Sequence, residues 1–223
     1  LSLPDDIYRI LENCKSLTIP RTKEELYSLS FGSAGNDVFQ VSYEVENLGE
    51  ICEATVTRCK NGVAVNYPED YMRRRDPDCL LVSDNSETDK PRYSDVYGKE
   101  FEPLRADTFE WFKAQDLIAM PFKAGDGEYG YNALLIVPRN AAFFAFALAN
   151  MQAILNYDEL PDDFRVKGFV FLAPPFRHTH FEGKQIVIHN RLQNTHEIFA
   201  YNLYPGPSAK KGIYGMLLNI GEQ

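Results

Sequence analysis

The spacing of apolar residues predicts helices and strands in the first third of the chain. Apolar residues recur at helical spacing over residues 4–15, which predicts an amphipathic helix. Thr22 and Glu25 have the spacing of a capping box, so a second, short helix is expected to begin there and to end at Gly32. Strand-like runs follow at Val38–Val45, Ile51–Arg58 and Val63–Tyr67.

The remainder of the chain alternates between strands and helices. Aromatic residues after Asp107 predict a helix that packs on the core. Asn140 is expected to cap a helix that runs to Leu155 and is apolar almost all round, and therefore central. Further strands are predicted at 79–82, Leu117–Phe122, Tyr129–Val137, Lys167–Ala173 and Glu197–Leu203. These elements predict an α/β fold, a mixed β-sheet flanked by helices on both faces.

Composition and charge narrow the class of protein. The chain has 223 residues, 44% of them apolar, so it is large enough for a substantial core. No repeat or linker divides it, and residues 1–223 are expected to form a single domain. Its 23 basic and 32 acidic residues give a net charge of −9, which argues against nucleic acid as the main partner. No apolar run approaches the roughly 20 residues that cross a bilayer, so no membrane partner is expected.

The four cysteines bear on the compartment in which the protein works. They show no C-x-x-C pairing, and most fall within predicted helices or strands. We interpret them as buried, reduced thiols of a cytoplasmic protein rather than as disulfides.

Two adjacent lysines follow the last predicted strand. Ser208 is a suitable N-cap for a helix, which would place Lys210 and Lys211 in its first turn. The positive end of the helix dipole disfavours cations there by roughly 0.3–1 kcal/mol each, so this pair predicts a site for an anion. Each lysine also favours the neutral amine of its neighbour, and a neutral amine can coordinate a metal ion. The alternative is a pair of solvated lysines at the frayed start of a helix.

A second cationic cluster lies between two predicted strands. Arg73, Arg74 and Arg75 are followed directly by Asp76 and Pro77. Guanidinium groups bind carboxylates and phosphates through paired hydrogen bonds, so the cluster predicts an anion clamp. The alternative is a solvated loop whose surface ion pairs contribute little to stability.

Both cationic clusters resemble turns of the phosphoenolpyruvate carboxykinases. Tyr204, the lysine pair and Gly212 are similar to the turn that leads from the last strand of that family's N-terminal domain into a helix. The strand GVAV, a short turn, Arg75 with the following Asp-Pro, and the strand CLLV are similar to the family's arginine turn. The resemblance covers most of residues 54–219 by the order of elements and is specific at these two turns.

The resemblance implies a role for each residue that matches. Tyr204 would face the substrate, and Arg75 would bind its carboxylate. Lys210 would contact the phosphate or the carboxyl group in transfer, and Lys211 would be a ligand of the catalytic Mn²⁺. Arg74 stands where the family has a glycine, which implies a more anionic or differently shaped substrate and makes Arg74 a further substrate-binding candidate.

The resemblance implies the substrate-side N-terminal domain of a carboxykinase-like phosphotransferase that acts on a small carboxylate or phospho-carboxylate. It extends to an uncharacterised bacterial family known only as a domain of unknown function. The expected partners are a small anionic metabolite and the protein's own C-terminal P-loop domain. A divalent metal, Mn²⁺ or Mg²⁺, and a nucleotide are expected only with that domain, so the fragment alone should hold no cofactor and be inactive. The alternative is a non-catalytic anion-binding or regulatory module.

All four histidines lie close together in the sequence. His178 and His180 form an H-x-H pair, and His189 and His196 are on or near the next two predicted strands. Such a group could bind zinc. The alternative is a set of polar histidines at a loop and at strand edges, because the spacing fits no familiar zinc motif.

Overall fold

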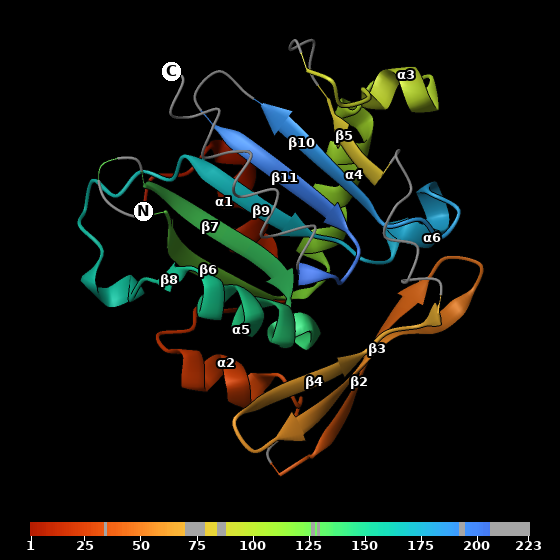
Figure 1. The fold of residues 1–223 in the computed structure, drawn as a ribbon. Helices are drawn as coiled ribbons and strands as arrows, with labels where there is room; N and C mark the ends of the chain where they lie inside the picture. Colours follow the sequence, from red (N-terminus) through yellow and green to blue (C-terminus); the bar gives the residue numbers. More distant parts are fainter. Residues whose placement is uncertain are drawn as a thin grey trace.

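The chain folds into two β-sheets with helices packed around them. The computed structural model describes residues 1–33, 35–69, 79–83, 88–125, 128, 130–191 and 195–205. A large mixed sheet occupies the middle, and a separate three-stranded antiparallel sheet lies below it in the view of Figure 1. Helices cover both faces of the large sheet, so the predicted α/β fold class is confirmed.

The described helices and strands have the following bounds. The helices are α1 (Asp5–Asn13), α2 (Lys23–Leu29), α3 (Tyr93–Tyr97), α4 (Glu102–Lys113), α5 (Ala142–Met151) and α6 (Phe176–His180), with 3-10 turns η4 (Arg139–Ala141) and η5 (Tyr157–Glu159). The strands are β1 (Ser16–Thr18), β2 (Val38–Val45), β3 (Gly49–Cys59), β4 (Gly62–Asn66), β5 (Leu80–Val82), β6 (Asp116–Ala124), β7 (Tyr131–Pro138), β8 (Ala153–Ile154), β9 (Gly168–Leu172), β10 (Ile186–Arg191) and β11 (His196–Tyr201).

Strand direction decides which strand ends meet. The order in the large sheet is β1-β6-β7-β9-β11-β10-β5, with β8 paired to β6. β7, β9 and β11 are parallel to one another, whereas β6 and β10 run antiparallel to them. β1 is parallel to β6, and β5 is parallel to β10. The carboxyl ends of β7, β9 and β11 therefore share one edge of the sheet with the starts of β10 and β5, and we call it the carboxyl edge.

Alternate residues of the central strands point into two different cores. In β7, Leu135 and Val137 belong to the core beneath α2 and α5, whereas Leu134 and Ile136 belong to the core beneath α1 and α4. Every residue of β9 and β11 is buried. Because both faces are covered, a strand such as β9 (GFVFL) is apolar throughout instead of alternating.

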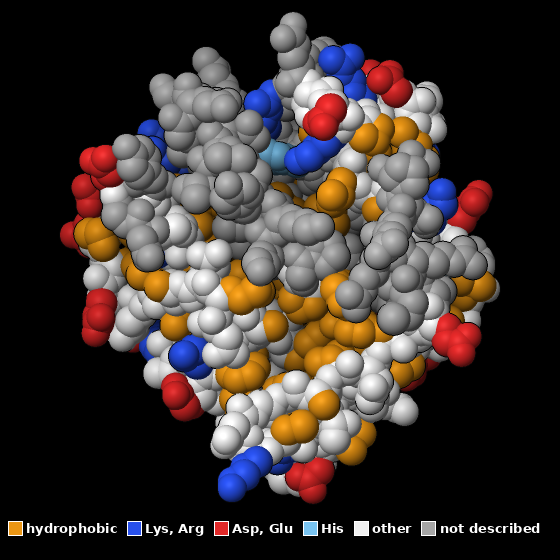
Figure 2. Space-filling view, in the orientation of Figure 1, with side chains coloured by type: hydrophobic (Ala, Val, Ile, Leu, Met, Phe, Trp, Pro, Cys, Tyr) orange, Lys and Arg blue, Asp and Glu red, His pale blue; other side chains and the backbone are white. Residues whose placement is uncertain are grey.

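The three-stranded sheet, in the order β2-β3-β4, packs on the same side as α5. Val41 and Val56 from this sheet share a core with Phe144 and Leu148 of α5. Figure 2 shows apolar side chains gathered at the surface between α5 and the three-stranded sheet. The small sheet is thus attached to the large one through a common apolar core.

Several sequence predictions are confirmed residue by residue. The first helix, α1, lies within the predicted range 4–15, and each predicted strand in the described part of the chain is present. Thr22 caps α2 by accepting a hydrogen bond from the Glu25 backbone N–H at 3.2 Å. The Glu25 carboxylate in turn accepts from the Arg21 backbone N–H at 2.8 Å, which completes a capping box displaced by one residue.

The prediction for the central helix is wrong at both ends. Asn140 does not cap it, because its side-chain amide donates instead to the Ser42 backbone carbonyl at 3.0 Å. The helix α5 ends at Met151 and not at Leu155, because the residues after it form β8 and pair with β6. The helix predicted after Asp107, α4, already begins at Glu102. At both ends of α5, a contact distant in sequence outweighs the local preference.

The cysteines are free thiols, but they are less buried than predicted. Cys52 and Cys59 are exposed on β3, and Cys14 and Cys79 are half-buried. Burial raises the pKa of the Cys14 thiol. None of the helices described combines the length and the apolarity that a membrane crossing requires.

Two glycines allow the effect of backbone strain on stability to be distinguished from the effect of a steric clash. Gly32 and Gly98 have nearly the same left-handed φ, 71° and 68°, but a Cβ on Gly32 would lie 2.6 Å from the Phe39 ring, whereas Gly98 has open space. We expect Gly98→Ala to lower the free energy of unfolding by about 1–2 kcal/mol through backbone strain alone. Gly32→Ala should cost roughly 1–3 kcal/mol more, because the ring must move. Urea denaturation measures both.

The double variant Gly32→Ala/Phe39→Leu serves as the control. A smaller side chain at position 39 should recover part of the extra loss. Equal losses for the two single variants would show that the Phe39 contact has no energetic effect.

Candidate functional site

The carboxyl edge is where several strands of the large sheet end or begin. β9 and β11 end there, and β10 and β5 begin there. In Figure 1 these strand ends meet near α6 and the three-stranded sheet. Ligand sites of open α/β sheets lie outside the carboxyl ends of the strands, so this edge is the place to examine.

A contact between two tyrosines joins the end of β4 to the end of β11. The Tyr67 hydroxyl donates a hydrogen bond to the Leu203 carbonyl at 2.9 Å. The rings of Tyr67 and Tyr204 lie with their centroids 5.3 Å apart. The Tyr204 backbone N–H donates to the Asn202 side-chain oxygen at 2.9 Å, which fixes the turn after β11.

Of the predicted site residues, the structure describes only Tyr204. Arg74 and Arg75, as well as Lys210 and Lys211, lie outside the described residues. The residues that flank their segments are described: Tyr67 contacts Tyr204, and Leu80, the first residue of β5, pairs with Val187 at the start of β10. The described chain therefore leads into both cationic segments at the carboxyl edge.

The helix α6 follows β9 and lies at the carboxyl edge. The backbone N–H of Ala173, just after β9, donates to the Ala200 carbonyl of β11 at 2.9 Å. The ring of Phe176 in α6 lies 5.7 Å from that of Tyr201, centroid to centroid. These contacts place α6 beside the end of β11, three residues before Tyr204.

A buried ion pair connects α6 to the three-stranded sheet. In the pairing of β2 with β3, Val41 faces Ala54 and Ser42 faces Cys52, which leaves Glu53 as the extra residue of a β-bulge. The bulge allows Glu53 and Ala54, adjacent in sequence, both to be buried. A regular strand would have turned one of the two towards solvent.

Glu53 meets Arg177 inside the protein. The Arg177 side chain donates from Nε and Nη2 to the two carboxylate oxygens of Glu53, each at 3.2 Å, and a third donor reaches the Gly183 carbonyl. Glu53 is 0% exposed and Arg177 is 1% exposed. Burial of two charges is costly unless they are paired with good geometry, and this fork arrangement supplies it.

Two more polar side chains surround Glu53. His178, next to Arg177, contacts a Glu53 oxygen through its Nε2. The buried Tyr43 hydroxyl forms no hydrogen bond with a described residue. Burial, together with the nearby Glu53 charge, raises the pKa of the Tyr43 phenol well above its ordinary value, so the phenol stays protonated.

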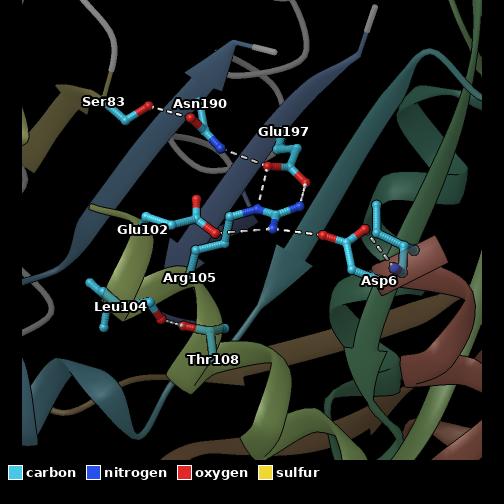
Figure 3. A network of polar contacts seen from close by, with 9 residues as sticks. Asp6, Ser83, Glu102, Leu104, Arg105, Thr108, Asn190 and Glu197 are labelled. Carbon is cyan, nitrogen blue, oxygen red and sulfur yellow. Dashed lines mark hydrogen bonds and ion pairs between the residues drawn. The ribbon is translucent and has the colours of Figure 1, made fainter. Parts of the chain in front are cut away.

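A second buried network closes the opposite edge of the sheet, where β11 begins (Figure 3). Arg105 of α4 donates to both oxygens of Glu197 at 2.9 and 2.8 Å, and its third nitrogen lies 2.7 Å from an Asp6 oxygen. Asn190 donates to Glu197 at 2.7 Å and accepts from Ser83 at 2.5 Å. Burial raises the pKa of the Glu197 carboxyl, and Arg105 opposes that shift. This network joins α1, α4, β5, β10 and β11, and the sequence analysis did not find it.

The four histidines are divided between the two edges. His178 and His180 lie on α6, whose helical form replaces the loop or strand edge that was predicted. His189 and His196 lie on neighbouring strands with ring centroids 5.7 Å apart at the opposite edge. Within the described ranges, no three His, Cys, Asp or Glu residues are grouped so as to hold a metal ion.

A polar pocket of about 340 Å³ lies at another place on the carboxyl edge. It opens between the end of α2 and the corner after β7, with Gly32, Phe39, Asp116, Arg139 and Asn140 among its walls. Arg139 is paired there with Asp116 at 3.7 Å. Tyr204, the one predicted site residue that the structure describes, does not line this pocket.

The fold and the edge described here define an α/β protein with a candidate site at the carboxyl edge of its large sheet. Residues 3–223 match a protein family described as a domain of unknown function (DUF4914), and the chain belongs to that family. No curated protein matches the chain. The family description names no activity and gives no link to the phosphoenolpyruvate carboxykinases.

A double-mutant cycle tests how strongly Glu53 and Arg177 depend on each other. Glu53→Gln or Arg177→Met alone should lower the free energy of unfolding by about 3–5 kcal/mol, because each leaves one buried polar partner uncompensated. The double variant should lose much less than the sum, and chemical denaturation measures the difference.

The exposed pair of Arg21 and Asp158 provides a matched control. Arg21 also donates to both oxygens of Asp158, at 3.1 Å each, but in solvent. Asp158→Asn should therefore change stability far less than Glu53→Gln. Additive losses at Glu53 and Arg177 would contradict their assignment as one energetic unit.

Proposed function

We propose that this chain is the substrate-side domain of a carboxykinase-like phosphotransferase that acts on a small carboxylate or phospho-carboxylate. The observation that carries the proposal is the contact between Tyr67 and Tyr204. Because Tyr67 precedes the segment with Arg75 and Tyr204 precedes the segment with the lysine pair, this contact supports the proposal that both segments start at the carboxyl edge.

The proposed roles follow from charge. Arg75, with Arg74 beside it, binds the carboxylate of the substrate through paired hydrogen bonds. Lys210 neutralises the negative charge that develops on the group in transfer. Tyr204 faces the substrate. Cations brought together repel one another unless an anion shares the site, so the arrangement favours an anionic ligand.

Metal and nucleotide belong to the proposed second domain. Lys211 is the only metal ligand that the proposal assigns to this chain. The described residues do not complete a ligand set, because they contain no group of three His, Cys, Asp or Glu residues suited to an ion. The nucleotide site is likewise assigned to the P-loop domain and not to this chain.

Ligand-dependent stabilisation tests the anion site directly. Phosphoenolpyruvate or inorganic phosphate should raise the melting temperature of the chain, because a ligand that binds only the folded state stabilises it. Arg75→Ala should abolish most of that rise while it leaves the melting temperature without ligand nearly unchanged. Differential scanning fluorimetry over a range of ligand concentrations measures both quantities.

Arg9→Ala is the matched control, because Arg9 is exposed on α1 and has no role in the proposal. It should retain the full ligand-dependent rise. A rise that survives in Arg75→Ala, or one that disappears in Arg9→Ala, would show that general screening of charge and not the proposed clamp is responsible.

The isolated chain should be inactive. We expect no turnover of ATP, GTP or pyrophosphate by the 223 residues alone, because one lysine cannot hold a metal ion in fixed geometry. A coupled phosphate-release assay, with Lys211→Ala as the reference, measures this. Turnover that Lys211→Ala abolishes would contradict the assignment of the metal and nucleotide sites to a second domain.

The coding sequence beyond Gln223 distinguishes between the two proposed functions, a phosphotransferase and a non-catalytic anion-binding module. A P-loop with a metal-binding aspartate would support the phosphotransferase. A stop codon or an unrelated domain would support the regulatory module and overturn the enzymatic part of the proposal.

A further inference from the structure

The polar pocket at the corner after β7 has the size of a small-molecule site. α2 contributes Leu29 to its wall, β2 contributes Phe39, β6 contributes Asp116, and η4 contributes Arg139 and Asn140. Its volume of about 340 Å³ is at the lower end of the range for such sites, about 300–1,000 Å³. Because β7 ends at this corner, the pocket lies at the carboxyl edge, where open α/β sheets bind ligands.

The guanidinium of Arg139 retains most of its hydrogen-bonding capacity. Its Nη2 lies 3.7 Å from Asp116 Oδ2, which is too long for a hydrogen bond. Its Nη1 donates one long hydrogen bond, at 3.5 Å, to the Ser16 hydroxyl. A guanidinium has five N–H donors, so within the described part of the chain most of those of Arg139 have no acceptor.

The carboxylate of Asp116 is fixed through one oxygen and available through the other. Ser16 pairs with Asp116 in the register of β1 with β6, and its hydroxyl donates to Oδ1 at 2.5 Å. Oδ2 lies 3.7 Å from Arg139 Nη2 and 4.0 Å from Lys15 Nζ, both beyond hydrogen-bond distance. The Lys15 side chain is 72% exposed, so it does not fill the pocket. Oδ2 therefore remains an acceptor beside a cation.

Asn140 provides a second acceptor without a donor. Its amide nitrogen donates to the Ser42 carbonyl at 3.0 Å, which fixes the orientation of the side chain. Its Oδ1 is buried and forms no hydrogen bond with a described residue. Buried polar atoms of proteins normally have a partner, so Asp116 and Asn140 leave this pocket wall short of donors.

Apolar surface adjoins the charged pair. Leu29 and Phe39 are half-buried and pack against the core beneath α5. The Phe39 ring can approach the end of α2 because Gly32 lacks a Cβ, which would lie 2.6 Å from the ring. Both Gly32 and Phe39 line the pocket. One wall thus offers an aromatic and an aliphatic side chain to a ligand.

We propose that this pocket binds a small zwitterion, an α-amino acid with an apolar side chain. The carboxylate of the ligand accepts hydrogen bonds from Arg139, its ammonium donates to Asp116, and its side chain contacts Phe39 and Leu29. An α-amino acid carries both charges on one carbon, which matches the close spacing of Arg139 and Asp116. A simple anion would be repelled by Asp116, and a simple cation by Arg139. The site goes beyond the proposed function, because Tyr204 does not line the pocket.

Calorimetric titration with L-leucine and L-phenylalanine tests the proposal. At least one of them should bind with a saturable heat. N-acetyl-L-leucine, which lacks the ammonium, and L-leucinamide, which lacks the carboxylate, should each bind about tenfold more weakly than L-leucine or worse, because each loses one charge-assisted hydrogen bond. Saturable binding of neither amino acid would overturn the proposal. Equal binding of N-acetyl-L-leucine and L-leucine would also overturn it and identify an anion site.

Variants of the charged pair assign the two ends of the ligand. Arg139→Gln should weaken L-leucine binding about tenfold or more. It should leave the melting temperature without ligand nearly unchanged, because Arg139 is exposed. Asp116→Asn retains an acceptor for Ser16 and should weaken L-leucine binding to a similar extent, but it should not weaken N-acetyl-L-leucine binding. A purely structural role of Asp116 would reduce both affinities.

Arg21→Gln is the matched control, because Arg21 is also an arginine paired with an aspartate but does not line the pocket. It should bind L-leucine with the affinity of the unaltered chain. Undiminished binding in Arg139→Gln, or an equal loss in Arg21→Gln, would show that the amino acid does not bind at the proposed pair.

Discussion

The central strands of the large sheet are buried on both faces, and this constraint decides where polar chemistry can occur. Every residue of β9 and β11 is buried, and alternate residues of β7 enter the two cores. Side chains in the middle of such strands are enclosed by apolar neighbours, where an unpaired charge is strongly disfavoured. Charged groups are therefore confined to the two edges of the sheet, and each edge has a buried arginine–carboxylate pair.

The two pairs fix different parts of the fold. Arg105 and Glu197 join the first helix and α4 to the start of β11, at the edge opposite the candidate site. Arg177 and Glu53 join α6 to the three-stranded sheet at the carboxyl edge. Since β4 pairs with β3, the second pair also fixes the position of Tyr67, from which the arginine segment begins. A buried ion pair adds little net stability compared with an apolar contact, so specification of this geometry is its more important effect.

Much of the fold could be predicted from local sequence, because the spacing of apolar residues and the identity of capping residues depend only on neighbouring positions. Apolar runs predicted the central strands, and Thr22 predicted the start of α2. The β-bulge at Glu53 could not be predicted, because it depends on the pairing of β3 with β2 and not on the pattern within β3. The end of α5 was missed for a similar reason, since the pairing of β8 with β6 outweighs the helical preference of the residues after Met151.

The candidate site divides in the same way. The charged residues of the two cationic segments could be recognised from sequence, because clusters of like charge need an explanation wherever they fold. The buried pair of Glu53 and Arg177 at the same edge could not be recognised: the two residues are separated by 124 positions, and each resembles an ordinary surface residue in its own segment. A single carboxylate in an alternating strand, or an arginine after Pro-Pro-Phe, gives no sign that it will be buried.

The carboxylate of Glu53 at the carboxyl edge is already engaged. Glu53 is bound by Arg177 and His178, so it has little capacity left to neutralise further cations. Under the proposed function, the arginines and the lysines therefore need an anion from another source. The proposal favours ligands that present two anionic groups at once, because these would engage both cationic clusters. A phospho-carboxylate has this chemistry, whereas a simple monocarboxylate does not.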